Sequence, residues 1–122
     1  MDSDRSMMEL ERELLQAEHV LNTEYSFDLA EPNYLRCLQV IQEAPELQPQ
    51  VEALLIELFE TRRVSDEPIA YLMHKLRWPG VQAWMERKLK ELPHSIAGGA
   101  PYEKVLAAYS DSWENREFYK GL

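Results

Sequence analysis

The sequence predicts an all-α fold, an irregular bundle of five to seven antiparallel helices that forms one domain over residues 1–122. Leu, Glu and Ala dominate the chain, whereas glycine occurs only four times and alternating runs of β-branched residues are absent. Apolar residues recur at helical spacing in successive segments, and prolines stand near the starts of several of them. The length of 122 residues suits a single domain with one core.

The first helix is expected near residues 4–22, with Ser3 or Asp4 as its N-cap. Its apolar stripe covers an arc of about 80° and comprises Met7, Leu10, Leu14, Ala17 and Leu21. Met8 and Leu15 lie one heptad apart on a second side of the same helix. Either this helix is buried on two sides or these two residues meet a partner.

Further amphipathic segments predict the remaining helices at residues 32–43, 49–62, 67–77 and 79–92 and after Gly98-Gly99-Ala100-Pro101. Ser65 or Asp66 is expected to cap the fourth helix. The tail from Asp111 to Leu122 is expected to add a short helix that presents Trp113 and Phe118. Helices three to five are also compatible with stacked hairpins of the HEAT type, so the choice between a short solenoid and an irregular bundle stays open.

The charge is strongly negative and unevenly distributed. The chain has 22 acidic and 13 basic residues, a net charge of −9. Residues 1–60 alone contain 14 acids and 3 bases, whereas the second half is close to neutral. Such a field repels nucleic acids and anionic lipids and attracts basic proteins. The acids of the first three helices are expected on outer helix faces, where they form either a docking face or a merely solubilising one.

The sequence lacks the motifs that usually mark catalysis. There is no Gly-rich phosphate loop, no nucleophile elbow and no Cys/His spacing suited to zinc. The only Glu-x-x-His match ends at His94 and is interrupted by Pro93. We therefore predict no catalytic residue, no metal site and no cofactor, and we do not expect an enzyme. His19 and His74 are expected to be exposed.

Three further features of the sequence concern the cellular compartment and the environments of Cys37 and Lys88. The single cysteine, Cys37, excludes an intramolecular disulfide and is expected to be a small buried residue. No apolar run is long enough for a membrane span, and the N-terminal sequence lacks the order of a signal peptide, so a cytoplasmic protein is expected. Lys88 falls within the apolar arc of its helix, so it is expected to snorkel or to pair with an acid at the core edge.

Candidate binding residues come from the acidic connections and from aromatic residues outside regular helices, because Trp and Tyr dominate interface hot spots. They are Glu24, Tyr25, Phe27, Asp28, Glu31, Glu43, Glu46 and Trp78.

The segment Pro68–Val81, with its Leu76-Arg77-Trp78-Pro79 stretch, resembles part of the small all-helical immunity proteins encoded beside bacterial polymorphic toxins. These systems include contact-dependent inhibition and type VI or Rhs-type delivery. The resemblance covers about 15 to 30 residues and implies a protein that binds one cognate toxin domain in the cytoplasm and occludes it without catalysis. Trp78 and Pro79 are more plausibly structural than contacts to a toxin.

We therefore expect an immunity-type protein that neutralises a toxin by covering its active site with an acidic helical surface. The inference that this toxin is a nuclease rests on charge alone. Two alternatives stay open, a helical adaptor or regulatory protein without a toxin partner and a small enzyme whose site the sequence does not reveal. The oligomeric state does not follow from the sequence.

Overall fold

The computed structural model describes residues 2–92 and 98–122, and these residues form helices and connections without any β-strand. The α-helices are α1 (Asp2–Glu24), α2 (Glu31–Glu43), α3 (Gln48–Glu60), α4 (Asp66–Leu76), α5 (Pro79–Glu91) and α6 (Ala100–Ala107). Short 3-10 helices are η1 (Phe27–Ala30), η2 (Pro45–Leu47) and η4 (Glu114–Phe118). The predicted all-α bundle is confirmed, and the observed helix ends lie close to the predicted ones.

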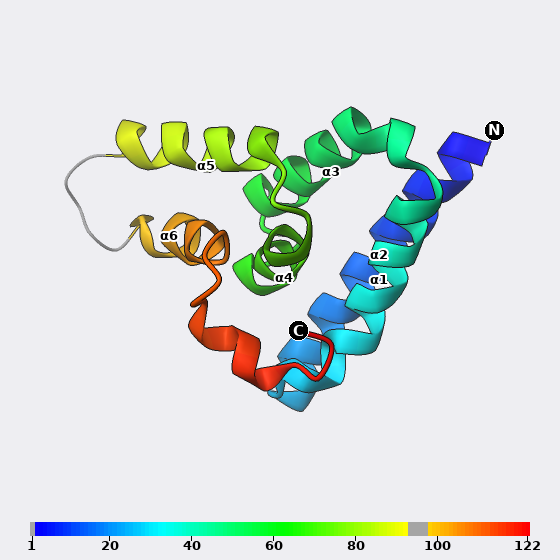
Figure 1. The fold of residues 1–122 in the computed structure, drawn as a ribbon, viewed down its shortest axis with the longest axis horizontal. Helices are drawn as coiled ribbons and strands as arrows, with labels where there is room; N and C mark the ends of the chain where they lie inside the picture. The colour runs from blue at the N-terminus through cyan, green and yellow to red at the C-terminus, as the bar shows by residue number, and fades with distance from the viewer. Residues whose placement is uncertain (1, 93–97) are drawn as a thin grey trace.

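The helices are arranged around three sides of the molecule. Figure 1 shows α1 and α2 as an antiparallel pair on one side and α3 and α5 along a second side. α4 lies between these two sides, and α6 packs against α4 and α5. The C-terminal segment, residues 111–122, runs back from α6 to the turn between α1 and α2. In this view α4 is seen nearly end-on while α5 lies across the page, so these consecutive helices cross steeply. The bundle is therefore irregular.

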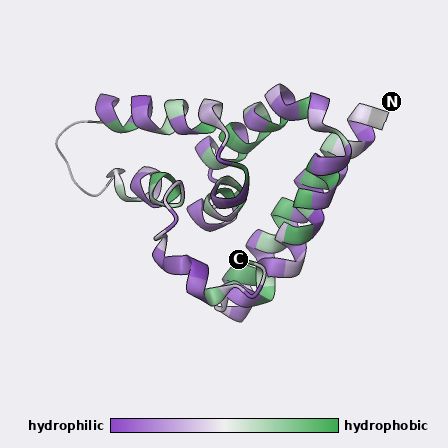
Figure 2. Cartoon of the chain, viewed as in Figure 1, coloured by the Kyte–Doolittle hydropathy of each residue, from purple (hydrophilic) through white to green (hydrophobic). Residues whose placement is uncertain are grey.

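One continuous apolar core joins all six helices and the C-terminal segment. Leu10, Leu14 and Ala17 of α1 are fully buried, as their spacing predicts. Figure 2 shows hydrophobic and hydrophilic residues alternating along the helices, whereas η4 is largely hydrophilic. On the second side of α1, Met8 stays 70% exposed. No described helix has the combination of length and apolar composition that a membrane span requires.

Acids expected on the outside in fact join the helices. Glu18 of α1 accepts hydrogen bonds from both the backbone N–H and the hydroxyl of Ser65, at 3.0 and 2.7 Å. Ser65 occupies the N-cap position of α4, but its hydroxyl is used in this way and does not cap the helix. Glu52 of α3 accepts from the backbone N–H of Val81 in the first turn of α5, at 3.0 Å.

A third carboxylate, Glu13 of α1, accepts from the side chains of Asn33 and Arg36 of α2, both at 3.0 Å. The expectation of a purely outward-facing acidic surface is therefore wrong for Glu13, Glu18 and Glu52. These three carboxylates accept hydrogen bonds that join neighbouring helices. The periodicity of the sequence does not reveal such contacts.

Other single-residue expectations have mixed outcomes. Cys37 is buried as expected, and burial raises the pKa of its thiol to about 12. Lys88 both snorkels and pairs, because its ammonium lies 3.6 Å from Glu60, 3.8 Å from Glu91 and 5.5 Å from the centre of the Trp84 ring.

Of the three histidines, His19 is exposed as expected. The expectation for His74 is wrong, because it is half-buried, with Nδ1 2.8 Å from the carbonyl oxygen of Ala108 and its ring 5.1 Å from that of Trp113. His94 lies outside the described residues.

Candidate functional site

Four apolar side chains stay exposed where the C-terminal segment meets the turn between α1 and α2. Tyr25, Phe27 and Leu29 belong to that turn and are 87%, 38% and 50% exposed, and Phe118 of η4 is 52% exposed. The rings of Phe27 and Phe118 pack edge to face, with 5.3 Å between their centres. We call these four residues the apolar patch. Large exposed apolar groups that gather in this way are typical of protein-binding surfaces.

Tyr25 has a backbone conformation that disfavours an aromatic residue. It directly follows α1 and has φ 54°, in the left-handed region that glycine usually occupies after a helix. A side chain there costs about 1 kcal/mol. The ring of Tyr25 is almost fully exposed, so packing within the chain does not offset this strain. Arg62 after α3 and Arg77 after α4 have the same backbone conformation, so a left-handed residue is a recurrent way of ending helices in this chain. What distinguishes Tyr25 is a large ring that is left exposed.

We expect Tyr25→Gly to raise the free energy of unfolding by about 0.5–1 kcal/mol, because glycine adopts positive φ without strain. Urea denaturation followed by circular dichroism measures this change. The same variant is expected to bind a partner more weakly than the native chain. A loss of stability in Tyr25→Gly would show that the ring packs against the fold.

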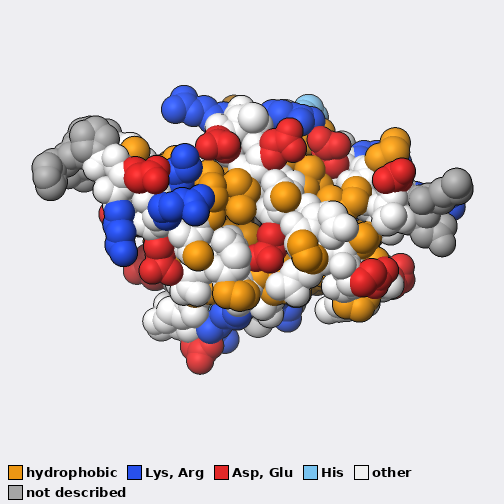
Figure 3. Space-filling view, turned by 90° about the horizontal axis from the view of Figure 1, so that it is seen from above, with side chains coloured by type: hydrophobic (Ala, Val, Ile, Leu, Met, Phe, Trp, Pro, Cys, Tyr) orange, Lys and Arg blue, Asp and Glu red, His pale blue; other side chains and the backbone are white. Residues whose placement is uncertain are grey.

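Exposed charges surround the apolar patch, and acids outnumber bases among them. Glu24 and Asp28 flank it on the turn and Glu114 and Glu117 on η4, whereas the C-terminal segment also carries the exposed bases Arg116 and Lys120. The hydroxyl of Ser26 donates a hydrogen bond to Asp28 and fixes that carboxylate. Figure 3 looks onto the opposite side of the molecule, where acidic and basic side chains mix and Lys and Arg gather over α5. The charge beside the patch therefore favours a basic partner.

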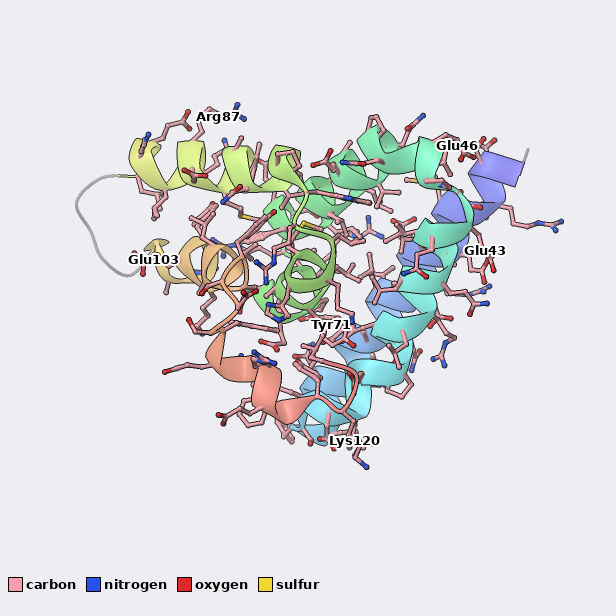
Figure 4. The ribbon with its side chains drawn as sticks, in the orientation of Figure 1. Glu43, Glu46, Tyr71, Arg87, Glu103 and Lys120 are labelled. Atoms are coloured by element: carbon pink, nitrogen blue, oxygen red, sulfur yellow. The ribbon has the colours of Figure 1, made fainter. Side chains whose placement is uncertain are left out.

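Glu43 and Glu46 do not join this surface. Figure 4 shows them at the far end of α2, beside the start of α3. The 13 residues of α2 separate the two ends by about 20 Å, at 1.5 Å per residue. Of the predicted binding residues, the structure brings together Glu24, Tyr25, Phe27 and Asp28.

Trp78 lies apart from this surface as well. It is the N-cap residue of α5 and is half-buried. Its carbonyl oxygen accepts a hydrogen bond from the hydroxyl of Tyr109 at 2.7 Å, which ties the α4–α5 corner to the residues that follow α6. This placement favours a structural role for Trp78.

Glu31 is buried inside the molecule, not displayed on its surface. It is 6% exposed and accepts hydrogen bonds from the Tyr71 hydroxyl at 2.7 Å and from the backbone N–H groups of Lys120 and Gly121, both at 3.0 Å. A Cβ atom at position 121 would lie 2.7 Å from Glu31 Oε2, so glycine permits this close approach. Figure 4 shows Tyr71 and Lys120 in the region where α4 and the C-terminal segment meet α2. Glu31 therefore holds the C-terminal segment in place.

A second buried carboxylate acts on the same segment. Glu67 of α4 is 5% exposed and accepts hydrogen bonds from the Asn115 side chain at 2.8 Å and from the Tyr119 hydroxyl. The rings of Tyr34, Tyr71 and Tyr119 pack together around these groups, with centres 4.7–6.0 Å apart. Burial, together with the charge of Glu67, raises the pKa of Tyr119, so the phenol stays a neutral donor. The oxygens of Glu67 are thus engaged in holding η4.

We call Glu31 and Glu67, together with the donors that they bind, the clamp on the C-terminal segment; both acids directly precede a proline in the sequence. Glu31-Pro32 and Glu67-Pro68 each stand in the first turn of a helix. The prolines indicate helix starts, and the acid before each one is well placed for the helix dipole. Nothing in the periodicity of either helix reveals that both carboxylates turn inward to bind the C-terminal segment.

Burial raises the pKa of Glu67, and the hydrogen bonds from Tyr119 and Asn115 offset part of this rise. A raised pKa means that the folded chain binds the proton more tightly than the unfolded chain. The stabilisation from this group is therefore full below the unfolded pKa of about 4.3 and is lost as pH rises through the folded pKa.

The amide of Glu67→Gln does not titrate, so this variant does not lose stability as Glu67 ionises. We therefore expect the free energy of unfolding of Glu67→Gln, relative to that of the native chain, to increase from pH 4.5 to neutral pH. Urea denaturation of both proteins at a series of pH values measures the difference. A difference that does not change with pH would contradict the raised pKa.

A groove of about 800 Å³ opens directly beside the apolar patch, and Phe27 belongs to both. Residues from the end of α1, the start of α4, α6 and the C-terminal segment line it. Among the described residues they include the carboxylates of Asp66, Glu67 and Glu114 and the ammonium of Lys104. The groove and the apolar patch together form one continuous surface.

Among residues 2–92 and 98–122, no three or more His, Cys, Asp or Glu side chains are grouped so that they could hold a metal ion. Comparison with protein-family models, with curated proteins and with solved structures finds no match to the chain.

Proposed function

We propose that this chain is a binding protein whose apolar patch and surrounding acids dock a basic protein and cover that protein's active site. The observation that carries the proposal is the patch itself, where two segments from opposite ends of the sequence place four exposed apolar side chains between exposed acids. Aromatic anchors within a polar rim are the usual composition of an interface. The almost complete exposure of the Tyr25 ring supports the same proposal.

The partner we propose is a cognate toxin domain, and the chain is then an immunity protein that acts in the cytoplasm. Two observations support this identity. The stretch Leu76–Val81 resembles helical immunity proteins, and the net charge of −9 complements the basic active site of a nuclease. Opposite charges accelerate the encounter, which suits a protein that must arrive before damage occurs.

The test is protection of cells from the protein encoded immediately upstream. We expect cells that produce that protein to grow only when the native chain is co-expressed. The double variant Tyr25→Ala/Phe118→Ala is expected to lose protection. Met8→Ala removes an exposed apolar side chain from α1, outside the apolar patch, and is expected to protect like the native chain. Loss of protection in Met8→Ala would place the docking surface on α1.

Failure of the native chain to protect would rule out this toxin as the partner. If the upstream protein is harmless but binds the native chain through the patch, the chain is an adaptor.

The association rate constant is expected to fall as the NaCl concentration rises, because the acids around the patch steer the encounter. A rate that does not depend on salt would contradict steering.

A further inference from the structure

The groove beside the apolar patch has an excess of negative charge. Three carboxylates and one ammonium group line it. Glu67 is engaged by Asn115 and Tyr119. Among the described residues, Asp66 and Glu114 accept no hydrogen bond from another side chain and form no ion pair. Two carboxylates with unused acceptor positions therefore face a space large enough for a side chain.

Asp66 is the more confined of the two. It lies in the first turn of α4 and is half-buried, and burial raises the pKa of its carboxyl while Lys104 opposes the rise. A carboxylate that has lost part of its hydration without gaining an ion pair is favourably placed to bind an incoming cation.

The other lining groups favour a flat cation that is apolar on its faces. Leu21 and the half-exposed ring of Phe27 supply carbon surface, the buried Trp113 reaches the groove only at its edge, and Ser110 and Ser112 line the same groove. A guanidinium packs its faces on aromatic rings while its edge donates to carboxylates. A lysine ammonium is a strongly hydrated point charge and does not use both kinds of surface.

We propose that the groove receives an arginine side chain of the basic partner, with Asp66 as the principal acceptor for its guanidinium. This proposal rests on the proposed function, because the arginine belongs to the protein that docks on the apolar patch. Phe27 joins the two surfaces, so one partner segment covers the patch and places its arginine in the groove.

The probe is the peptide acetyl-Gly-Arg-Gly-amide, titrated into the full ¹⁵N-labelled chain at pH 7.5 and followed by NMR. We expect saturable shifts of the Trp113 indole N–H and of the backbone amides of Asp66 and Ala107. The same peptide with citrulline in place of arginine keeps the shape without the charge and is expected to cause no such shifts.

Two variants test the position of the binding site. Ala107→Phe fills the groove from an exposed position on α6 without changing the charge, and Asp66→Asn removes the acceptor charge. Each is expected to weaken peptide binding at least tenfold. Glu103→Gln removes the same charge from an exposed position of α6 that does not line the groove, and it is expected to bind like the native chain. Thermal unfolding confirms that all variants fold.

Unsaturable shifts spread over many acidic residues, equal shifts with citrulline, or native binding by Ala107→Phe would each overturn the groove proposal. The same variants distinguish failure of the groove proposal from failure of the proposed function. If Tyr25→Ala/Phe118→Ala abolishes protection and Ala107→Phe does not reduce partner affinity, the groove proposal fails and the proposed function stands. If the peptide binds in the groove but the native chain does not protect cells, only the toxin assignment fails.

Discussion

Glu31→Ala is expected to lower the free energy of unfolding by on the order of 3 kcal/mol. The substitution leaves three donors without their acceptor, namely the Tyr71 hydroxyl and the backbone N–H groups of Lys120 and Gly121. The Tyr71 side chain is fully buried, so water does not readily replace the carboxylate there. Hydrogen bonds to a charged acceptor are also stronger than neutral ones.

Urea denaturation monitored by circular dichroism measures this loss. Glu24→Ala is the matched control, because it removes an exposed carboxylate seven positions earlier and is expected to change stability by less than about 0.5 kcal/mol. Glu31→Gln keeps one acceptor oxygen and is expected to fall between the two. Equal midpoints for Glu31→Ala and Glu24→Ala would show that the C-terminal segment is held by apolar packing alone.

Trp113→Ala and Phe118→Ala are expected to separate folding from binding. Trp113 is 6% exposed and packs against His74 and Tyr119, with ring centres 5.1 and 6.1 Å away. Its removal is expected to cost about 3–5 kcal/mol of folding free energy. Phe118 lies five residues further along and is 52% exposed, so its removal is expected to cost under about 1 kcal/mol.

Partner binding by the folded protein is expected to depend mainly on Phe118, because Trp113 exposes too little surface to act as an anchor. Phe118→Ala removes an exposed ring of the apolar patch and is expected to weaken partner binding at least tenfold, as loss of an interface anchor usually does. Calorimetric unfolding and titration of the purified partner give the two quantities for each variant. Native affinity in Phe118→Ala would remove η4 from the docking surface.

The sequence was sufficient to predict the helices because their signals are local. Prolines such as Pro32 and Pro79 stand in the first turn of the helices they were expected to begin, and the spacing of Leu10, Leu14 and Ala17 matches a buried stripe. These features depend on neighbours within one or two turns, which composition and periodicity describe well.

The candidate surface is only partly predictable from the sequence, because it combines residues of the α1–α2 turn with Phe118, which lies far away in the chain. Tyr25 and Phe27 were identified as aromatic residues outside regular helices, but nothing near Phe118 indicated that it would meet Phe27. The sequence places Glu31 among the acids of the connections and so predicts that it is exposed. Its burial depends on partners that are 40, 89 and 90 positions away. Local pattern does not predict contacts of such separation.

The clamp on the C-terminal segment also constrains how the chain is made. Glu31 emerges from the ribosome long before the backbone N–H groups of Lys120 and Gly121 that bind it. Until those residues have been synthesised, the Glu31 carboxylate has no backbone donor to bind, and the C-terminal segment does not yet pack on the α1–α2 pair. Contacts of this sequence separation form late, since closing a long loop is entropically unfavourable. Nascent chains that stop short of residue 121 are therefore expected to remain protease-sensitive.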